Sequence, residues 1–396
     1  MVNTTIAVEN EYLLSFGEKL PLSIEYGRGV KVWDETGKEY LDFTSGWAVT
    51  SLGHGHSVIL DAMIHQSRKI MHNPNSGLTY SPARAQLLTR LMAILPAHLR
   101  KVFFTNSGAE ANDAAIKLAR KCTGKKKVIS TMRSFHGRTI GTTSATGQDI
   151  HRDRFNVLVP YFEFVPFNDI PALKTAIDSD TAAVIVEPIQ GEAGVRIPDP
   201  GYLAEAYSLC KEHGVLLIID EIQTGFFRTG PAFACLEQNV NPDIMTMAKG
   251  IAGGFPFGAV AVSEQVALRI EHGDHGGTYN GNPLGCAIAA AVIDFMTSNG
   301  IGESVKSLGE KLEGMLEDLQ SRFPCLITGI RGKGLLWAVD LVNPELASHV
   351  HDRCVEKGLL LNLKHGTVIR IFPALTIKER ELVCGIGMIR EVLMEV

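Results

Sequence analysis

The chain has 396 residues, of which 45% are hydrophobic and 20% charged, a profile typical of a globular protein with a large core. Its net charge of −5 provides no bulk attraction to nucleic acid or to an anionic membrane, so we expect neither as a partner. The seven cysteines have no C-x-x-C spacing, and no basic leader or membrane-length apolar run is present. These features predict a cytoplasmic protein without disulfides.

The first predicted element is a β-hairpin in VKVWDETGKEYLDF, residues 30–43, where two strand-like runs flank a turn that contains Gly37. From about residue 60 to 280, short apolar runs alternate with helical patterns such as Gly108–Lys121 and Tyr202–His213. The predicted strands are Val102–Thr105, Val128–Thr131, Ala182–Val186, Val215–Ile219, Ile244–Met247 and Ala259–Val262. Such alternation predicts an α/β domain with a mostly parallel sheet covered by helices.

The pattern changes after about residue 282, where long predicted helices flank short strands. The helices are Pro283–Ser298, Ser304–Arg322 and Lys378–Glu395, and the strands are Leu335–Leu341 and Val368–Phe372. This order of elements predicts an α+β domain. We therefore divide the chain into an N-terminal part of a small domain at 1–59, a large domain at 60–281 and the C-terminal part of the small domain at 282–396.

Two charged residues lie where buried strands are predicted to end, which is the edge of a parallel sheet at which ligands bind. Asp220 follows the apolar run VLLII, and a carboxylate in such a place needs a cation beside it. Lys249 follows IMTM and precedes several glycines. A buried lysine has a lowered pKa and can act as an amine nucleophile; the alternative is a side chain that snorkels out to solvent.

Small residues follow another predicted strand. Ser107, Gly108 and Ala109 open a helix, so its backbone N–H groups and dipole can bind an anion; a plain N-cap with no ligand is the alternative. The residues alone leave these two readings open.

The loop SFHGRT, which contains Phe135, His136 and Arg138, follows the strand Val128–Thr131. Its aromatic ring can stack on a flat ligand, and its arginine can bind a carboxylate through two parallel hydrogen bonds. The alternative is a surface loop with a packing phenylalanine and a solvated arginine. An anion site, an aromatic loop, a strand-end aspartate and a strand-end lysine together are the parts that hold pyridoxal phosphate. The cation beside Asp220 is then the protonated pyridine nitrogen.

The motifs FFTNSGAEANDAAIKLAR, SFHGRT, VIVEPIQGEAGV, LLIIDEIQTGFFRTG, MAKGIAGG, GGTYNGNPLGCA and VIRIFPALT follow one another in this order. Over nearly its whole length the chain resembles the class III aminotransferases of fold type I, most closely the acetylornithine/succinylornithine group. The 4-aminobutyrate and ornithine aminotransferases are similar to a lesser degree. The resemblance implies a mostly parallel seven-stranded sheet in the large domain and a smaller α+β domain built from both ends of the chain.

The resemblance also implies roles for residues that would bind the cofactor, pyridoxal 5′-phosphate. Lys249 would form the Schiff base, Asp220 would bind the pyridine nitrogen and Gln223 would lie near the phenolic oxygen. Phe135 would stack on the ring within the loop that also holds His136. Ser107, Gly108 and Ala109 would bind the phosphate. Thr278 would reach the phosphate of a neighbouring subunit, which implies a homodimer with shared active sites.

The remaining implied roles concern an amino donor and a keto acid, both small molecules. Arg138 and Arg370 would bind carboxylates, and Glu192, which by itself is an ordinary loop glutamate, would pair with Arg370 and mask it. Trp47 occupies a variable pocket position; we expect it to shape the substrate channel, with a buried packing tryptophan as the alternative. His54 and His56 are expected to be turn residues, and no metal site is predicted.

The expected reaction is the ping-pong transfer of a terminal amino group from an amine or amino acid, such as N-acetylornithine, to 2-oxoglutarate. A 4-aminobutyrate- or ornithine-type donor, or a specialised amine or aldehyde, is the alternative. A racemase or aminomutase would also need Lys249 and Asp220, but it would have one substrate and no use for Glu192 and two arginines. A non-catalytic binding module would not need Lys249.

Overall fold

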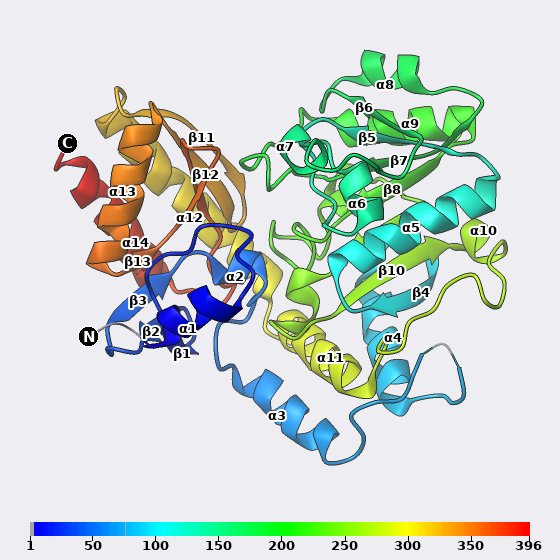
Figure 1. The fold of residues 1–396 in the computed structure, drawn as a ribbon, viewed down its shortest axis with the longest axis horizontal. Coiled ribbons are helices and arrows are strands. Elements are labelled where there is room, and N and C mark those ends of the chain that lie inside the picture. The colour runs from blue at the N-terminus through cyan, green and yellow to red at the C-terminus, as the bar shows by residue number, and fades with distance from the viewer. Residues whose placement is uncertain (1–3, 76) are drawn as a thin grey trace.

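The computed structural model describes residues 4–75 and 77–396 (Figure 1). A seven-stranded sheet forms the centre of the larger part of the molecule. In sheet order its strands are β4 (Leu99–Thr105), β10 (Gly258–Ser263), β9 (Ile244–Met247), β8 (Leu216–Asp220), β7 (Thr181–Val186), β5 (Lys127–Thr131) and β6 (Phe162–Val165). Only β10 runs antiparallel to its neighbours, so the predicted mostly parallel sheet is confirmed.

The central strands are buried along their length, and β7 and β9 have no exposed residue. Such strands are continuous apolar runs because helices cover both faces of a parallel sheet. The helices of this part are α4 (Pro82–Ile94), α5 (Gly108–Thr123), α6 (Ile140–Ala145), α7 (Asp149–Arg152), α8 (Ile170–Ala176), α9 (Tyr202–His213) and α10 (Glu264–Ala267), with short 3₁₀ turns η1 (Ala234–Gln238) and η2 (Lys249–Ala252). Helix α5 ends at Gly124, whose left-handed φ of 69° favours glycine.

Several predicted boundaries need correction. The seventh strand, β6, was not predicted because its sequence FEFV is short and contains a charged residue; it is an edge strand that pairs only with β5. Strand β8 includes Asp220 as its last residue. Helix α12 (Ile301–Arg322) begins before Ser304, because the left-handed Gly300 lies at its N-cap.

Segments from the two ends of the chain form the smaller part of the molecule (Figure 1). The strands β1 (Ile24–Arg28), β2 (Lys31–Asp34), β3 (Glu39–Asp42) and β13 (Leu359–Leu360) form one sheet, and β11 (Ile327–Lys333), β12 (Leu336–Leu341), β15 (Val368–Ile371) and β14 (Asn362–Lys364) form another. The antiparallel pairing of β2 with β3 confirms the predicted hairpin. Strand β13 pairs in parallel with β3, so Leu359 lies beside Leu41. The sequence did not predict β1, β11, β13 or β14.

The remaining helices are α1 (Thr4–Tyr12), α2 (Ser45–Ala48), α3 (Ser57–Ser67), α11 (Pro283–Ser298), α13 (Pro344–Lys357) and α14 (Glu379–Leu393). Helix α11 packs against α3 and α4, where it connects the two parts of the fold. Within residues 4–75 and 77–396, no single helix is long and apolar enough to cross a membrane. Helices α11 and α12 pass that test only as a pair, and they are bent by 65° where they meet.

Candidate active site

A cavity of about 420 Å³ opens at the carboxyl ends of the central strands. Most of the predicted site residues line it: Ser107, Gly108, Ala109, Phe135, His136, Arg138, Glu192, Asp220, Gln223 and Lys249. Residues from five separate segments of the chain therefore meet in one place. This is the location expected for a ligand in a parallel sheet.

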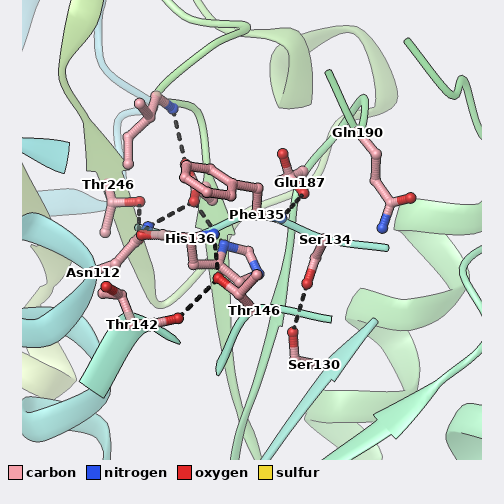
Figure 2. Close-up of polar contacts among 12 residues, drawn as sticks. Asn112, Ser130, Ser134, Phe135, His136, Thr142, Thr146, Glu187, Gln190 and Thr246 are labelled. Carbon is pink, nitrogen blue, oxygen red and sulfur yellow. Dashed lines mark hydrogen bonds and ion pairs between the residues drawn. The ribbon is translucent and has the colours of Figure 1, made fainter. Parts of the chain in front are cut away.

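The floor of the cavity is a network of hydrogen bonds around Asp220, which is only 4% exposed. Its Oδ2 accepts a hydrogen bond from Asn112 Nδ2 at 2.7 Å and lies 2.8 Å from His136 Nδ1. Asn112 Oδ1 in turn accepts from Thr246 Oγ1 at 2.7 Å, and these side chains converge in Figure 2. The Oδ1 atom of Asp220 accepts from the backbone N–H of Ile222 at 3.0 Å. The carboxylate is therefore held in one orientation.

Asn112 is a site residue that the sequence analysis missed. It lies on the buried face of α5 among alanines and Ile116. A polar side chain on the apolar face of an amphipathic helix is the signal that identifies such a residue, because a buried amide needs partners.

Lys249 is the first residue of η2, and Ala248 alone separates it from β9; its φ of 43° is left-handed. A non-glycine residue in this region is strained, and such strain is concentrated at functional sites. Burial lowers the pKa of the Lys249 amine, and the charge of Glu192 opposes this only in part. The amine lines the cavity, so the alternative of a side chain that reaches out to solvent is wrong.

Glu187 is a second residue of the cavity that the sequence did not identify as part of the site. Its Oε2 accepts a hydrogen bond from the backbone N–H of Phe135 at 3.1 Å, which fixes the aromatic loop (Figure 2). Burial raises the pKa of the Glu187 carboxyl well above its usual range, and the charge of Asp220 adds to this effect. Both effects favour the neutral acid form of Glu187.

Glu192 and Arg370 form the ion pair that the sequence predicted. Arg370 is fully buried, and its Nη1 lies 2.7 Å from Glu192 Oε1 and 2.9 Å from Gly191 O. The Nε atom donates to Asn362 Oδ1 at 2.6 Å, whereas Nη2 is buried without a hydrogen-bond partner among the described residues. Arg370 is thus bonded through Nε and Nη1, whereas its Nη2 is buried without a partner in the described chain, and Glu192 separates it from the cavity lining.

Glu192 is held by a second cation, because Lys364 Nζ lies 3.0 Å from its Oε2. Burial alone would raise the pKa of Glu192, but the charges of Arg370 and Lys364 outweigh it and hold this pKa well below its usual range. Glu192 is therefore ionised in the folded protein.

Arg138 lies at the mouth of the cavity on an exposed loop. Its guanidinium lies 5.4 Å from the centre of the Phe135 ring, and its Nη1 lies 3.0 Å from His151 Nδ1. Burial, together with the charge of Arg138, lowers the pKa of His151 to about 4. The neutral imidazole therefore accepts a hydrogen bond from Arg138. Sequence reasoning did not identify His151, because its position in the chain shows no pattern related to the site.

Trp47 lies in α2, where Ser45, Gly46, Trp47 and Ala48 all have left-handed backbone conformations. The side chain of Asp42 holds this turn by accepting from the backbone N–H of Ser45 at 3.1 Å, and it pairs with His54 Nε2 at 2.9 Å. Trp47 is 55% exposed, and its ring lies 5.8 Å from the Arg370 guanidinium. The alternative of a buried packing tryptophan is therefore wrong for this chain.

Residues 15–393 match the family model described as aminotransferase class-III. The chain belongs to the class-III aminotransferases.

Among curated relatives, the aminotransferase is 41% identical to the acetylornithine aminotransferase of Methanothermobacter thermautotrophicus, over 98% of each chain. It is 42% identical to that of Methanopyrus kandleri, over 94% of each chain. Among solved structures, acetylornithine aminotransferase from Elizabethkingia anophelis has a TM-score of 0.88 at 34% identity and covers 99% of this chain and 98% of its own. Ornithine aminotransferase from Toxoplasma gondii has a TM-score of 0.93 at 32% identity and covers 99% and 94%.

The cofactor of this aminotransferase is pyridoxal phosphate, and the residues present fit it. Both polar atoms of the Gln223 amide are buried without a partner in the described part of the chain, as is His136 Nε2. Such atoms call for a polar ligand. A Cβ atom added at Gly108 would lie 2.7 Å from Ile222 Cδ1, so the absence of a side chain leaves room at the start of α5. The helix N-terminus, where Ser107 is the N-cap, offers backbone N–H groups to a phosphate.

Thr278, the last predicted residue of the cofactor site, is exposed and does not line the cavity of its own chain. Its role depends on a second subunit and stays a prediction.

Proposed function

We propose that this aminotransferase moves the terminal amino group of an amino acid such as N-acetylornithine to 2-oxoglutarate. The observation that carries the proposal is the Glu192–Arg370 pair beside Arg138, because it offers one permanent and one maskable carboxylate site near a reactive amine. Relatives named acetylornithine aminotransferase, at 41% and 42% identity over nearly their whole lengths, support this donor. An ornithine-type donor is the second candidate, supported by the likeness to the Toxoplasma enzyme.

Lys249 is proposed as the residue that carries the cofactor and moves the proton. Its lowered pKa keeps a larger share of the amine neutral, and a neutral amine is both a nucleophile and a base. When bound, pyridoxal phosphate supplies an aldehyde carbon that accepts the amino group and a ring that withdraws electrons from the reacting carbon. Lys249 would take the proton from the substrate carbon that bears the transferred amino group, which is the terminal carbon of an ω-amine donor and Cα of glutamate, and would hold that proton for return.

The residues on the floor of the cavity are proposed to bind the polar and charged groups of the cofactor. Asp220 is proposed to bind the protonated pyridine nitrogen, and its contacts with Asn112 and His136 orient it for that purpose. Gln223 is proposed to donate to the phenolic oxygen, which would satisfy its buried amide. Residues 107–109 would hold the phosphate, and Phe135 would stack on the ring.

Arg138, Arg370 and Glu192 are proposed to let one site bind two different substrates in turn. Arg138 is proposed to bind the carboxylate that the donor and the keto acid share. Arg370 would bind the additional carboxylate of the keto acid through the Nη1 atom that Glu192 occupies in this structure. Glu192 masks Arg370 while the donor is bound and moves away when the dicarboxylate enters.

We further propose a cytoplasmic homodimer in which Thr278 reaches the cofactor phosphate of the other subunit. Its exposure outside the cavity of its own chain supports this role. The domain division at 1–59, 60–281 and 282–396 is also proposed, and the pairing of β3 with β13 supports it. Mixing Thr278→Ala with Lys249→Ala subunits should restore some activity through hybrid sites; an active monomer in sedimentation would contradict the dimer.

The function is tested on the purified holoenzyme. Borohydride reduction and peptide mapping should locate the pyridoxyl label on Lys249, and a label on another lysine would overturn its role. A panel of donors with 2-oxoglutarate should show the highest kcat/KM for an ω-amino acid such as N-acetylornithine. A racemase would instead change its substrate without any keto acid.

A further inference from the structure

A second cavity, of about 800 Å³, lies against the loop that carries Glu192 but shares no lining residue with the active site. The loop residues Ala193 and Arg196 form one wall. Strands β11, β12 and β15 supply another, which includes Arg331 and Asp340, and Arg133 comes from the loop after β5. No role in the transfer reaction requires this cavity.

The cavity carries an excess of positive charge. Arg331 pairs with Asp340 through both terminal nitrogens, with Nη2 3.0 Å from Oδ1. The charge of Asp340, the one carboxylate among the described lining residues, is therefore already balanced by Arg331. Arg133 and Arg196 have no carboxylate within ion-pair distance in residues 4–75 and 77–396. Arg133 and Arg196 are exposed, and both line the cavity together with Arg331.

The fold holds the two unpaired arginines near each other through Gln190. The backbones of Gln190 and Arg196 exchange two hydrogen bonds of 3.0 Å. The Gln190 side chain, which Figure 2 shows near Glu187, donates to Thr131 Oγ1 at 2.9 Å and to Met132 O at 3.0 Å. Arg133 follows Met132 directly. One buried amide thus connects the backbones of both arginine-bearing loops.

We propose that this cavity binds a small anion with two or more negative charges, of the phosphate or polycarboxylate class. Two guanidinium groups that line one cavity and have no carboxylate partner in the described chain match such an anion, because arginine binds phosphate and carboxylate oxygens through paired hydrogen bonds. A monovalent anion would leave part of this charge unbalanced.

The bound anion acts on the Glu192 loop. Arg331 Nε donates to Gly194 O at 2.7 Å, and His365 Nε2 lies 2.8 Å from Glu192 O. Both side chains line the second cavity, so they connect it directly to the backbone that must move when Glu192 leaves Arg370. An anion bound beside these two side chains shifts the balance between the two loop positions.

Binding is tested by calorimetric titration of the holoenzyme with inorganic phosphate and, separately, with citrate, at constant ionic strength. The double variant Arg133→Gln, Arg196→Gln should weaken binding roughly ten- to a hundredfold. Arg138→Gln, which removes the active-site arginine, should leave this binding unchanged. Binding of phosphate alone or of citrate alone identifies which source supplies the anion. Equal affinity in the wild type and the double variant, or a loss only in Arg138→Gln, would overturn the proposal.

The effect on the loop is tested by single-turnover rates of each half-reaction with and without the anion. These rates should change in the wild type and stay constant in the double variant, which keeps every active-site residue. This second test rests on the proposed role of Glu192, whereas the titration does not. If the anion binds but the rates do not change, the proposed effect on the Glu192 loop is wrong and the anion site stands. If no anion binds, both proposals are wrong.

Discussion

The floor and the mouth of the active site are built in different ways. On the floor, Asp220 is nearly fully buried at the end of a central strand, and three hydrogen-bond donors fix its carboxylate. At the mouth, Arg138 lies on an exposed loop and Trp47 on a strained turn. The aspartate proposed to bind the cofactor thus belongs to the buried sheet, whereas Arg138 and Trp47, two of the residues proposed for substrate choice, lie on exposed segments.

Glu187 and Glu192 show the same contrast within one segment. Glu187 directly follows β7, and its burial favours the protonated acid. Glu192 lies in the loop beyond, where Arg370 and Lys364 favour the carboxylate. Burial favours the protonated form of Glu187, whereas two neighbouring cations favour the ionised form of Glu192. The contributions of the two glutamates to the free energy of unfolding should therefore depend on pH in opposite directions.

The largest effect is expected for Lys249→Ala, which removes the amine from the floor. Turnover should fall by at least about 10²–10⁴-fold, the usual contribution of a positioned proton-transfer group. Steady-state rates measure this, with Lys174→Ala on the exposed side of α8 as the matched control. A loss of less than tenfold would show that Lys249 does not move the proton.

Asp220→Asn keeps the shape of the floor but removes its charge. Turnover should fall by roughly ten- to a hundredfold, equivalent to the loss of a charge-assisted hydrogen bond of about 1.5–3 kcal/mol. Cofactor affinity, measured by dialysis and absorbance, should weaken in parallel. Asp199→Asn, on an exposed turn, is the control. A variant with native rates would place the cofactor away from Asp220.

At the mouth, Glu192→Gln should affect the two half-reactions differently. The ω-amine half-reaction should slow by about tenfold because Arg370 is no longer masked, whereas reaction with glutamate should be preserved or faster. Arg370→Gln should impair the 2-oxoglutarate half-reaction more than the other. Single-turnover absorbance separates the halves, and equal losses in both for Glu192→Gln would make Glu192 only structural.

The dependence of stability on pH should distinguish the two glutamates. The folded-state pKa of Glu192 is depressed, so its contribution is present above about pH 4.3 and is lost as pH falls through that folded-state pKa. The folded-state pKa of Glu187 is raised, so its contribution is present below about pH 4.3 and is lost as pH rises through its folded-state pKa.

Denaturant titrations of Glu192→Gln and Glu187→Gln between pH 3 and 8 test this difference, on the order of 1 kcal/mol for each pKa unit. Glu192→Gln should be most destabilising at neutral pH, and Glu187→Gln should be least destabilising there. Parallel pH curves for the two variants would contradict the contrast between floor and mouth.

The smallest effect is expected for Trp47→Ala. Because the side chain is 55% exposed, the free energy of unfolding should change by no more than about 0.5 kcal/mol. The ranking of amino donors should nevertheless change, since the indole lies beside Arg370. Donor panels of the two proteins measure this; an unchanged ranking would remove Trp47 from the substrate channel.

The sequence predicted what depends on local pattern. The apolar runs identified most of the large sheet, and strand-end position identified Asp220 and Lys249, because a charge after a buried strand is unusual. Asn112, Glu187 and His151 were missed since each acquires its role from residues distant in the chain. Strand β6 was missed because an edge strand needs only one apolar face.

The parallel pairing of β3 with β13 also bears on how the chain folds during synthesis. Leu41 leaves the ribosome early, but its partner Leu359 is made more than three hundred residues later. Until then, one edge of β3 has no partner strand, and an open edge invites pairing with another chain. The sheet of β1, β2, β3 and β13 is therefore completed only after all strands of the large sheet have been synthesised.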